Sequence, residues 1–320
     1  MNLALIGYGK VGRAFARLLA RKQAQFPFRV VGIHTARHGT ATDAGGLDIE
    51  PSFGPPAASV EEFLDRSRAE VVFELTPLNP STGEPAMSHI RAAFARGMHV
   101  VTANKGPVAH NYAGLRDDAL RAGVQFRFES TVMDGAPVFN LVRETMPGVE
   151  VLGFAGVLNS TTNIVIEAME AGRTLEEGVE TARRLGIAES DVSYDLDGWD
   201  AAAKTAALAN VLMGGRVTPL DVDTRGIRRQ TPEKLAELKA KGKTVRLVSR
   251  THRGKEGLKM RVRAEVLDAA DTLATARGTS SFLLIETDLM GTLGVFEGNP
   301  GVEQTAYGLF SDLVDIARAI

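Results

Sequence analysis

The sequence contains no cysteine, and this absence excludes more chemistry than any other feature of its composition. Without thiols there is no disulfide, no Cys-ligated zinc or iron–sulfur cluster and no thiol nucleophile. The six histidines show no HExxH-type spacing, which disfavours a zinc enzyme. Any chemistry must therefore use Lys, Asp or Glu side chains, hydroxyl groups or a bound cofactor.

Long apolar runs and an excess of one charge are also missing. No uninterrupted apolar stretch approaches the ~20 residues of a membrane-spanning helix. The 37 basic and 39 acidic residues nearly balance, so nothing favours nucleic acid or an anionic membrane as a partner. The chain begins with strand-like residues instead of a basic leader, and we expect a cytoplasmic protein that binds a small molecule.

Short apolar segments alternate with amphipathic segments over the first 130 residues. The expected strands are Asn2–Ile6, Phe28–Ile33, Val71–Leu75, His99–Thr102 and Val124–Phe128. The expected helices are Val11–Ala20, Val60–Arg66, Glu84–Arg96 and Ala113–Ala122. Continuous apolar strands that alternate with helices are typical of a parallel sheet covered on both faces. The Gly/Pro-rich segment Gly39–Pro56 is expected to be a long, mobile surface loop.

The pattern changes near residue 130. A run of expected helices follows, and strand-like segments dominate from about residue 244. The last segment, Val302–Ala319, carries Leu309, Leu313 and Ile316 at helical spacing. We therefore predict an α/β domain over residues 1–130, completed by the C-terminal helix 302–320, and an α+β domain over residues 131–301.

A GxGxxG motif, Gly7-Tyr8-Gly9-Lys10-Val11-Gly12, lies between the first expected strand and the first expected helix. In such a motif the first glycine permits a tight turn, the second lets the backbone approach a pyrophosphate, and the third lets the helix pack closely on the strand. The helix N-terminus then faces the phosphate charge. Glycine-rich turns are common, but this position at the head of a repeated βα pattern favours a Rossmann dinucleotide-binding domain.

The end of the second expected strand lacks a carboxylate. An NAD-binding fold usually has Asp or Glu there to bind the ribose 2′-hydroxyl, whereas Ile33–His38 contains neither. Arg37 can hold the 2′-phosphate of NADP, or it can be an ordinary solvated arginine, and the sequence leaves both open. We expect NADP(H) to be preferred, with use of NAD(H) still compatible with the sequence.

Three further segments carry a family resemblance. They are Val100–Pro107 (VVTANKGP), Leu158–Asn163 (LNSTTN) and Asp195–Lys204 (DLDGWDAAAK). With the GxGxxG motif they resemble homoserine dehydrogenase, and the resemblance runs over essentially the whole chain. Two positions depart from the family pattern: Ser160 stands where a glycine is usual, and Val132–Pro137 replaces a VGGGxP-like turn.

The resemblance implies an NAD(P)-dependent oxidoreductase that interconverts L-homoserine and L-aspartate 4-semialdehyde in threonine, methionine and isoleucine biosynthesis. It implies a homodimer, with residues 131–301 as the substrate-binding and dimerisation domain. It also implies a short form of the family without a C-terminal ACT regulatory domain.

Two lysines are the candidates for proton transfer. Lysine suits this role because burial or nearby positive charge can lower its pKa. By the resemblance, Lys204 is the proton donor and Lys105 contacts the cofactor and assists. Asp200 and Lys204 are four residues apart and share a helix face, although the same spacing is common in exposed ion pairs of little energetic value.

An acidic cluster precedes Lys204. It comprises Glu189, Asp191, Asp195, Asp197 and Asp200. Such a cluster repels itself unless it has a cationic partner, and the ammonium group of an amino acid would serve. By the resemblance, Glu189 binds the substrate with Asp195 and Asp200 beside it, and Thr162 is a further substrate-binding candidate. Asp191 and Asp197 are better explained as solvated turn residues.

The remaining candidates concern the cofactor and a cation. Expected cofactor contacts are Gly7, Gly9, Lys10, Val11, Gly12, Arg37, Thr76, Thr102, Lys105 and Gly301. The resemblance places a monovalent cation, Na⁺ or K⁺, at Glu129 and at backbone carbonyls near Val132, Asp134 and Ala136. Oxygen ligands suit a hard cation, and a strand-end salt bridge at Glu129 is the equal alternative.

Two other functions share features with this one. Aspartate-semialdehyde dehydrogenase needs a thiol for its acyl-enzyme, which the absence of cysteine excludes. The other rival is a non-catalytic nucleotide-binding regulator with the same fold. A regulator need not keep Lys105, Glu189, Asp200 and Lys204 together, so the sequence favours the enzyme.

Overall fold

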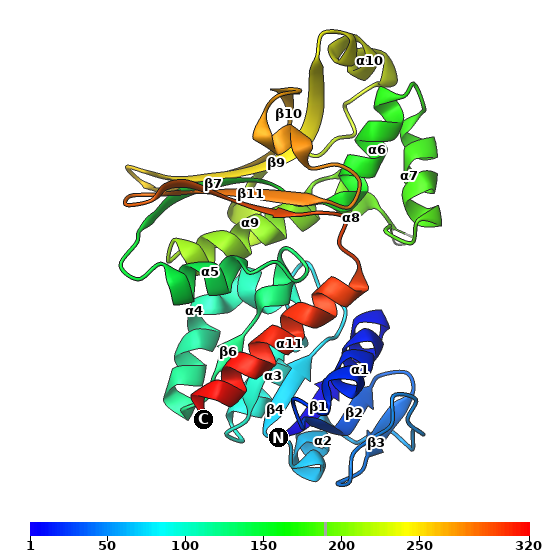
Figure 1. Cartoon of the computed structure of the whole chain (residues 1–320), viewed down its shortest axis with the longest axis vertical. Coiled ribbons are helices and arrows are strands. Elements are labelled where there is room, and N and C mark those ends of the chain that lie inside the picture. Colours follow the sequence, from blue (N-terminus) through cyan, green and yellow to red (C-terminus); the bar gives the residue numbers. More distant parts are fainter. Residues whose placement is uncertain (189–190) are drawn as a thin grey trace. The chain divides into compact units, whose positions relative to one another are not determined.

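The structure is a computed structural model that describes residues 1–188 and 191–320 (Figure 1). Contacts between Cα atoms divide the chain into unit 1, Met1–Phe139 with Gly301–Ile320, and unit 2, Asn140–Pro300. The sequence-based boundary at residue 130 falls inside unit 1, so the domain limits stay a prediction. Among the described residues, no helix is both long and apolar enough to cross a membrane.

Unit 1 contains a six-stranded sheet with the order β3-β2-β1-β4-β5-β6. The strands are β1 (Asn2–Ile6), β2 (Arg29–Thr35), β3 (Gly39–Thr42), β4 (Val71–Glu74), β5 (His99–Thr102) and β6 (Phe126–Arg127). All neighbours are parallel except the antiparallel pair of β2 and β3. The order reverses between β1 and β4, and open α/β sheets bind their ligands at the carboxyl ends of the strands beside such a reversal. The predicted Rossmann-type α/β fold is confirmed.

The helices of this unit are α1 (Lys10–Lys22), α2 (Val60–Ser67), α3 (Ala86–Phe94), α4 (Lys105–Ala122) and α11 (Val302–Ala319), with the 3-10 turn η1 (Glu129–Thr131). The α11 helix packs against α1, as Figure 1 shows. Its Leu309, Leu313 and Ile316 are fully buried, as the helical spacing of these residues predicts. The last helix of the chain thus closes the core around the first strand.

Two segments of unit 1 differ from the sequence-based expectation. The predicted loop Gly39–Pro56 begins with strand β3, which pairs with β2 through a turn in which Gly39 has a φ of +90°. The predicted helix at Ala113 begins earlier, at Lys105, because the Asn104 side chain accepts a hydrogen bond from the Gly106 N–H and caps it. Pro107 is tolerated in the first helical turn, and the non-helical backbone of Asn111 interrupts the helix.

Unit 2 contains a second six-stranded sheet with the order β12-β11-β7-β9-β10-β8. Its strands are β7 (Val151–Val157), β8 (Asp223–Thr224), β9 (Lys243–Gly254), β10 (Gly257–Asp268), β11 (Ser281–Thr287) and β12 (Gly291–Glu297). The pairs are antiparallel, apart from β8 with β10. This mixture of a sheet and helices matches the predicted second sheet domain.

The helices of the second half are α5 (Val138–Thr145, which starts in unit 1), α6 (Ser160–Glu170), α7 (Leu175–Arg184), α8 (Ser193–Leu196), α9 (Trp199–Leu212) and α10 (Pro232–Ala240), with η2 (Pro219–Asp221) and η3 (Thr272–Thr275). Helix α9 is rich in alanine and almost wholly buried. Small side chains let its backbone lie close to its neighbours, which gives Asp200 and Lys204 on this helix a rigid support.

Candidate functional site

The GxGxxG turn joins β1 to α1 at the reversal of strand order. Gly7 has a φ of +98°, and a Cβ there would lie 2.6 Å from the Leu75 carbonyl oxygen, so only glycine fits. A Cβ on Gly12 would lie 3.2 Å from Cδ2 of Tyr8. The first and third glycines therefore have the steric roles that the motif predicts.

The second glycine faces open space. A Cβ on Gly9 would meet no heavy atom within 4 Å, and Gly9 and Lys10 are exposed. Gly9 is also the N-cap of α1, where no side chain caps the helix. The first N–H groups of the helix, among them those of Lys10 and Val11, are thus left for an anion, which suits the pyrophosphate of a dinucleotide.

Arg37 lies at the tip of the β2–β3 hairpin. Ala36, Arg37 and His38 are all exposed, and the turn is fixed by a hydrogen bond from the His38 N–H to the Thr35 hydroxyl at 2.8 Å. Within residues 1–188 and 191–320, no acidic side chain pairs with Arg37. The guanidinium therefore stands at the carboxyl end of β2 with its donors available to a ligand.

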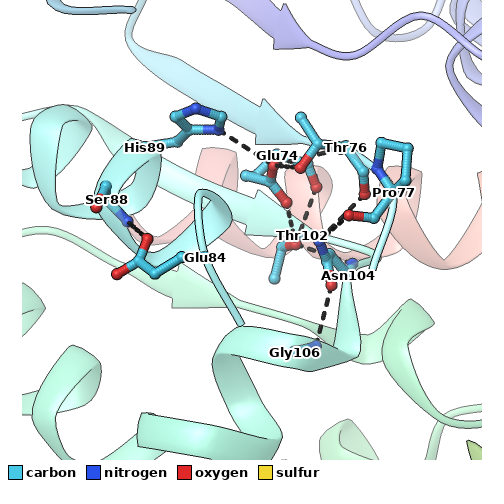
Figure 2. A network of polar contacts seen from close by, with 9 residues as sticks. All are labelled: Glu74, Thr76, Pro77, Glu84, Ser88, His89, Thr102, Asn104 and Gly106. Carbon is cyan, nitrogen blue, oxygen red and sulfur yellow. Dashed lines mark hydrogen bonds and ion pairs between the residues drawn. The ribbon is translucent and has the colours of Figure 1, made fainter. Parts of the chain in front are cut away.

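Glu74 is a fully buried carboxylate at the end of β4 and the centre of a polar network (Figure 2). Its Oε1 accepts hydrogen bonds from the Thr76 hydroxyl and the Thr76 N–H and lies 3.4 Å from Nδ1 of His89. Its Oε2 lies 3.4 Å from the Thr102 hydroxyl, which is 2.9 Å from the Glu74 carbonyl oxygen. The network joins the carboxyl ends of β4 and β5 and brings together the candidates Thr76 and Thr102.

Asn104 extends this network to α4 (Figure 2). Its N–H donates to the Thr102 hydroxyl at 2.9 Å, and its Nδ2 donates to the Thr76 carbonyl oxygen at 3.1 Å. Its Oδ1 accepts from the Gly106 N–H at 3.0 Å. Lys105, half-buried, is the first residue of the helix that this side chain caps, so its backbone is fixed at the same edge of the sheet.

The second group of candidates lies in unit 2, where two aspartates share one amide. Nδ2 of Asn159 donates to Oδ1 of Asp195 at 2.7 Å and to Oδ2 of Asp200 at 2.9 Å. Asp195 comes from α8 and Asp200 from the first turn of α9, while Asn159 precedes α6. Three elements thus meet at a pair of neighbouring carboxylates.

Lys204 joins this pair from the next turn of α9. Its Nζ donates to the Leu158 carbonyl oxygen at 2.5 Å and lies 3.5 Å from Oδ2 of Asp200. The side chains of Lys204 and Asp200 are 17% and 13% exposed, so the pair is not the solvated surface pair that its spacing alone allowed. The ammonium is held in place by these contacts, and the Lys204 side chain keeps a small exposed fraction, which suits a proton-transfer group.

Burial and mutual repulsion shape the acidity of this cluster. Burial, and then the charge of Asp200, raise the pKa of Asp195, while hydrogen bonds from Asn159 and Thr161 and the charge of Lys204 oppose the rise. Burial and the two aspartates also raise the pKa of Tyr194, whose buried hydroxyl has no hydrogen-bond partner among the described residues. Such a site favours the binding of a further cation.

The other acidic candidates lie in different surroundings. Glu189 falls outside the described residues, so its predicted substrate contact stays a prediction. Asp191 is exposed and accepts a hydrogen bond from the Ser193 N–H, and Asp197 pairs with Arg228 at 2.5 Å. Thr162 is fully buried, and its hydroxyl donates to the Asn159 carbonyl oxygen at 3.0 Å. It helps to fix the turn that holds Asn159, and its own contact with substrate stays a prediction.

The candidate cation loop is compact. Glu129 is buried; its Oε1 accepts from the Phe139 N–H at 2.8 Å, and its own N–H donates to Asp312, also buried, at 2.8 Å. Asp134 accepts from the Thr305 hydroxyl at 2.9 Å, and Val132 and Ala136 are buried beside it in the chain. No group of three or more His, Asp or Glu side chains suited to a metal occurs in the described part of the chain.

Sequence reasoning missed Asn159, Glu74 and Asp312 as members of these networks. Asn159 lies within the LNSTTN segment, where an Asn followed by Ser-Thr-Thr is itself an N-cap signal. Glu74 ends the apolar run Val71–Phe73, an unusual place for an acid. Nothing in the local pattern marks Asp312, because its partner is far away in the sequence. Gly301, a cofactor candidate, is the exposed N-cap of α11.

Comparisons with known proteins match both halves of the chain. Residues 137–314 match the family model described as homoserine dehydrogenase, and residues 7–129 match the model described as its NAD binding domain. A homoserine dehydrogenase of Methanocaldococcus jannaschii is 36% identical, over 99% of this chain and 98% of its own. An NAD(+)-dependent homoserine dehydrogenase of Pseudomonas canavaninivorans is 32% identical, over 99% and 96%.

A solved structure is similar as well. It is a hyperthermophilic archaeal homoserine dehydrogenase in complex with NADPH, with a TM-score of 0.84 and 27% sequence identity. The similarity covers 100% of this chain and 98% of that one.

Proposed function

Because the chain belongs to the homoserine dehydrogenase family, we propose that it interconverts L-homoserine and L-aspartate 4-semialdehyde with a nicotinamide dinucleotide. The observation that carries the proposal is the cluster of Asp195 on α8 with Asp200 and Lys204 on α9, in which Asn159 hydrogen-bonds to both aspartates. It combines an anionic site for an amino acid's ammonium group with a lysine for proton transfer. We propose the threonine, methionine and isoleucine pathway as the context of this reaction.

The roles of the residues follow from this chemistry. When bound, the nicotinamide takes up or supplies the hydride at C4 of the substrate. Asp195 and Asp200 hold the substrate's ammonium group, and Glu189 is proposed to do the same. Nζ of Lys204 gives a proton to the aldehyde oxygen in reduction and receives it in oxidation. Lys105 is proposed to contact the cofactor and assist.

We propose that NADP(H) is the preferred cofactor. Arg37 supports this preference, because it is exposed just after β2, pairs with no acid among the described residues, and has no Asp or Glu beside it in Ile33–His38 to repel a 2′-phosphate. A charge-assisted guanidinium–phosphate contact contributes about 1.5–3 kcal/mol, roughly a ten- to hundredfold difference in affinity. The relatives include one named for NAD(+) and one bound to NADPH, so family membership leaves the choice open.

Arg37→Ala should therefore narrow the gap between the two cofactors by about tenfold or more, chiefly through weaker NADPH binding. Isothermal titration of NADPH and NADH against both proteins measures this. An unchanged affinity ratio in the variant would remove Arg37 from the role.

The proposal has three further parts. We propose a homodimer in which residues 131–301 provide the dimerisation domain, together with the substrate site. We also propose a Na⁺ or K⁺ ion at Glu129 and the backbone carbonyls near Val132, Asp134 and Ala136. We further propose that the protein is cytoplasmic. Sedimentation of the protein tests the homodimer, and enzyme activity in buffers free of Na⁺ and K⁺ tests the cation.

Turnover separates the enzyme from a non-catalytic nucleotide-binding regulator. The full chain with L-homoserine and NADP, at alkaline pH where oxidation is favoured, should produce the absorbance of the reduced nicotinamide. Nucleotide binding without any absorbance change, with NADP or NAD, would favour the regulator and contradict the proposal.

A further inference from the structure

Asn159 uses both ends of its side chain. Its Oδ1 accepts a hydrogen bond from the Thr162 N–H at 2.8 Å and so caps α6. Its Nδ2 donates one hydrogen to Asp195 at 2.7 Å and the other to Asp200 at 2.9 Å. The residue is 4% exposed, so the amide makes these contacts in a buried position.

The two possible orientations of the Asn159 side-chain amide are not equivalent. If it were flipped, the NH₂ group would face the Thr162 N–H and the carbonyl oxygen would face two carboxylates, so that three contacts would become repulsive. The helix cap therefore fixes which end of Asn159 points at the aspartates. A single buried donor group thus sets the separation of two carboxylates that belong to α8 and α9.

We propose that Asn159 is a positioning residue that holds Asp195 and Asp200 together as a pre-assembled acceptor for the substrate's ammonium group. The inference rests on the proposed function, because that function supplies an amino-acid substrate. Asn159 acts through the two aspartates and does not touch the reacting atoms.

The charges around Asp195 predict how removal of the amide would act. Asp200 is the neighbouring anion, Lys204 is the neighbouring cation, and Tyr194 is a buried phenol close to both aspartates. Burial and Asp200 already raise the pKa of Asp195, and the Asn159 hydrogen bond opposes this rise. Without Asn159, the aspartates repel with less compensation, and Asp195 takes up a proton at a higher pH.

Two substitutions separate the positioning role from the helix cap. Asn159→Ser keeps a good N-cap but is too short to donate to both aspartates, whereas Asn159→Ala loses both functions. We expect both variants to raise the KM for homoserine by roughly ten- to hundredfold, as the loss of an aligned ionic contact predicts, with a smaller change in kcat. Asn159→Ala should lower the thermal midpoint more than Asn159→Ser, because only the alanine variant also loses the helix cap. NADPH affinity should be unchanged in both.

The pH profile supplies a readout that a cap alone would not move. The acidic limb of kcat/KM for homoserine should shift to higher pH in Asn159→Ser. The carboxyl ¹³C resonance of Asp195, assigned with Asp195→Asn, should titrate at higher pH in the same variant, and this measurement needs no turnover. If Asn159→Ser keeps the wild-type titration of Asp195, the inference is wrong even if the wild-type chain oxidises homoserine. If the titration shifts but the wild-type chain has no activity, the positioning holds and the proposed function fails.

Discussion

At the scale of single residues, the same spacing serves two kinds of ion pair in this chain. Asp200–Lys204 and Glu237–Lys241 are both four residues apart on a helix. The side chains of the second pair are 66% and 62% exposed, whereas those of the first are 13% and 17% exposed. Among the described residues, only the buried pair has further hydrogen-bond partners, Leu158 and Asn159, so the surroundings and not the spacing distinguish this candidate site from a surface pair.

Lys204→Ala should lower kcat for homoserine oxidation by about 10²–10⁴-fold, because general acid–base catalysis contributes that much. Its affinity for NADPH should stay within twofold of the wild type. Lys241→Ala is the matched control and should leave both quantities unchanged. A Lys204→Ala variant that keeps more than a tenth of the wild-type kcat would remove Lys204 from proton transfer.

The raised pKa of Asp195 predicts a dependence on pH. Asp195 attracts an ammonium group only when it is ionised, so substrate affinity is present above this pKa and is lost as the pH falls through it. Because the pKa is raised, the loss starts at a higher pH than for an ordinary aspartate. The KM for homoserine should therefore rise on acidification, whereas Asp195→Asn should have a high KM that lacks this step. The same acidic step in the variant would assign it to another group.

Much of this site could be predicted from the sequence, residue by residue, but its connections could not. The segment Asp195–Lys204 identified both aspartates and the lysine, because a family pattern fixes residue types at fixed spacing. The amide of Asn159 that joins them lies on a different element. Such a contact depends on how helices α6, α8 and α9 pack, and no local pattern contains that information.

At the scale of elements, the polar network around Glu74 joins two strand ends that the sequence treats separately. Thr102 of β5 and Thr76 after β4 are far apart in the chain, yet both contact the same buried carboxylate (Figure 2). The positions of the apolar strands were predictable from hydrophobic runs. The hairpin to β3 and the early start of α4 were not, because a glycine turn and an asparagine cap outweighed the local loop signals.

Thr102→Val should disturb the edge of the sheet that we assign to the cofactor. The hydroxyl donates to the Glu74 carbonyl oxygen and accepts from the Asn104 N–H, and its loss leaves buried groups unpaired at a cost of about 1–3 kcal/mol. We expect NADPH affinity to fall by roughly tenfold as the turn that carries Lys105 loosens. Thr251→Val is the control, because the Thr251 hydroxyl is buried without a hydrogen-bond partner among the described residues. Equal NADPH affinities in both variants would refute this role of the network.

Arg246 on β9 holds the sheet of unit 2 to α6. Its side chain is fully buried, donates to the Ala276 carbonyl oxygen at 2.9 Å and lies 3.6 Å from both Glu167 and Glu170. Arg246→Met leaves two carboxylates without their cation and should lower the free energy of unfolding by about 3 kcal/mol. Lys243→Met, on the same strand but in an exposed pair with Asp268, should change it by less than about 1 kcal/mol. Urea unfolding of the two variants measures these changes in the free energy of unfolding. Similar losses in both variants would mean that the burial of Arg246 does not add to its effect on stability.

At the scale of the whole molecule, a division of labour follows from the two sheets. The parallel sheet of unit 1 presents strand ends and a helix N-terminus, which are structures that bind a dinucleotide. The mixed sheet of unit 2 supports α6 and α9. Helix α9 carries Asp200 and Lys204, and Asn159, the N-cap of α6, joins Asp200 to Asp195 of α8. The alternation of strands and helices made the first sheet predictable, whereas the strand order of the second depends on pairings across long stretches of chain.

The most direct test of the proposed reaction follows the hydride from homoserine to the cofactor. L-Homoserine with both C4 hydrogens replaced by deuterium is incubated with the full chain and NADP, and the reduced cofactor is examined by mass spectrometry. The account predicts one deuterium in each molecule of reduced cofactor and an equal amount of aspartate 4-semialdehyde, trapped as its hydrazone. Reduced cofactor without deuterium, or no reduced cofactor with either NADP or NAD, would contradict it.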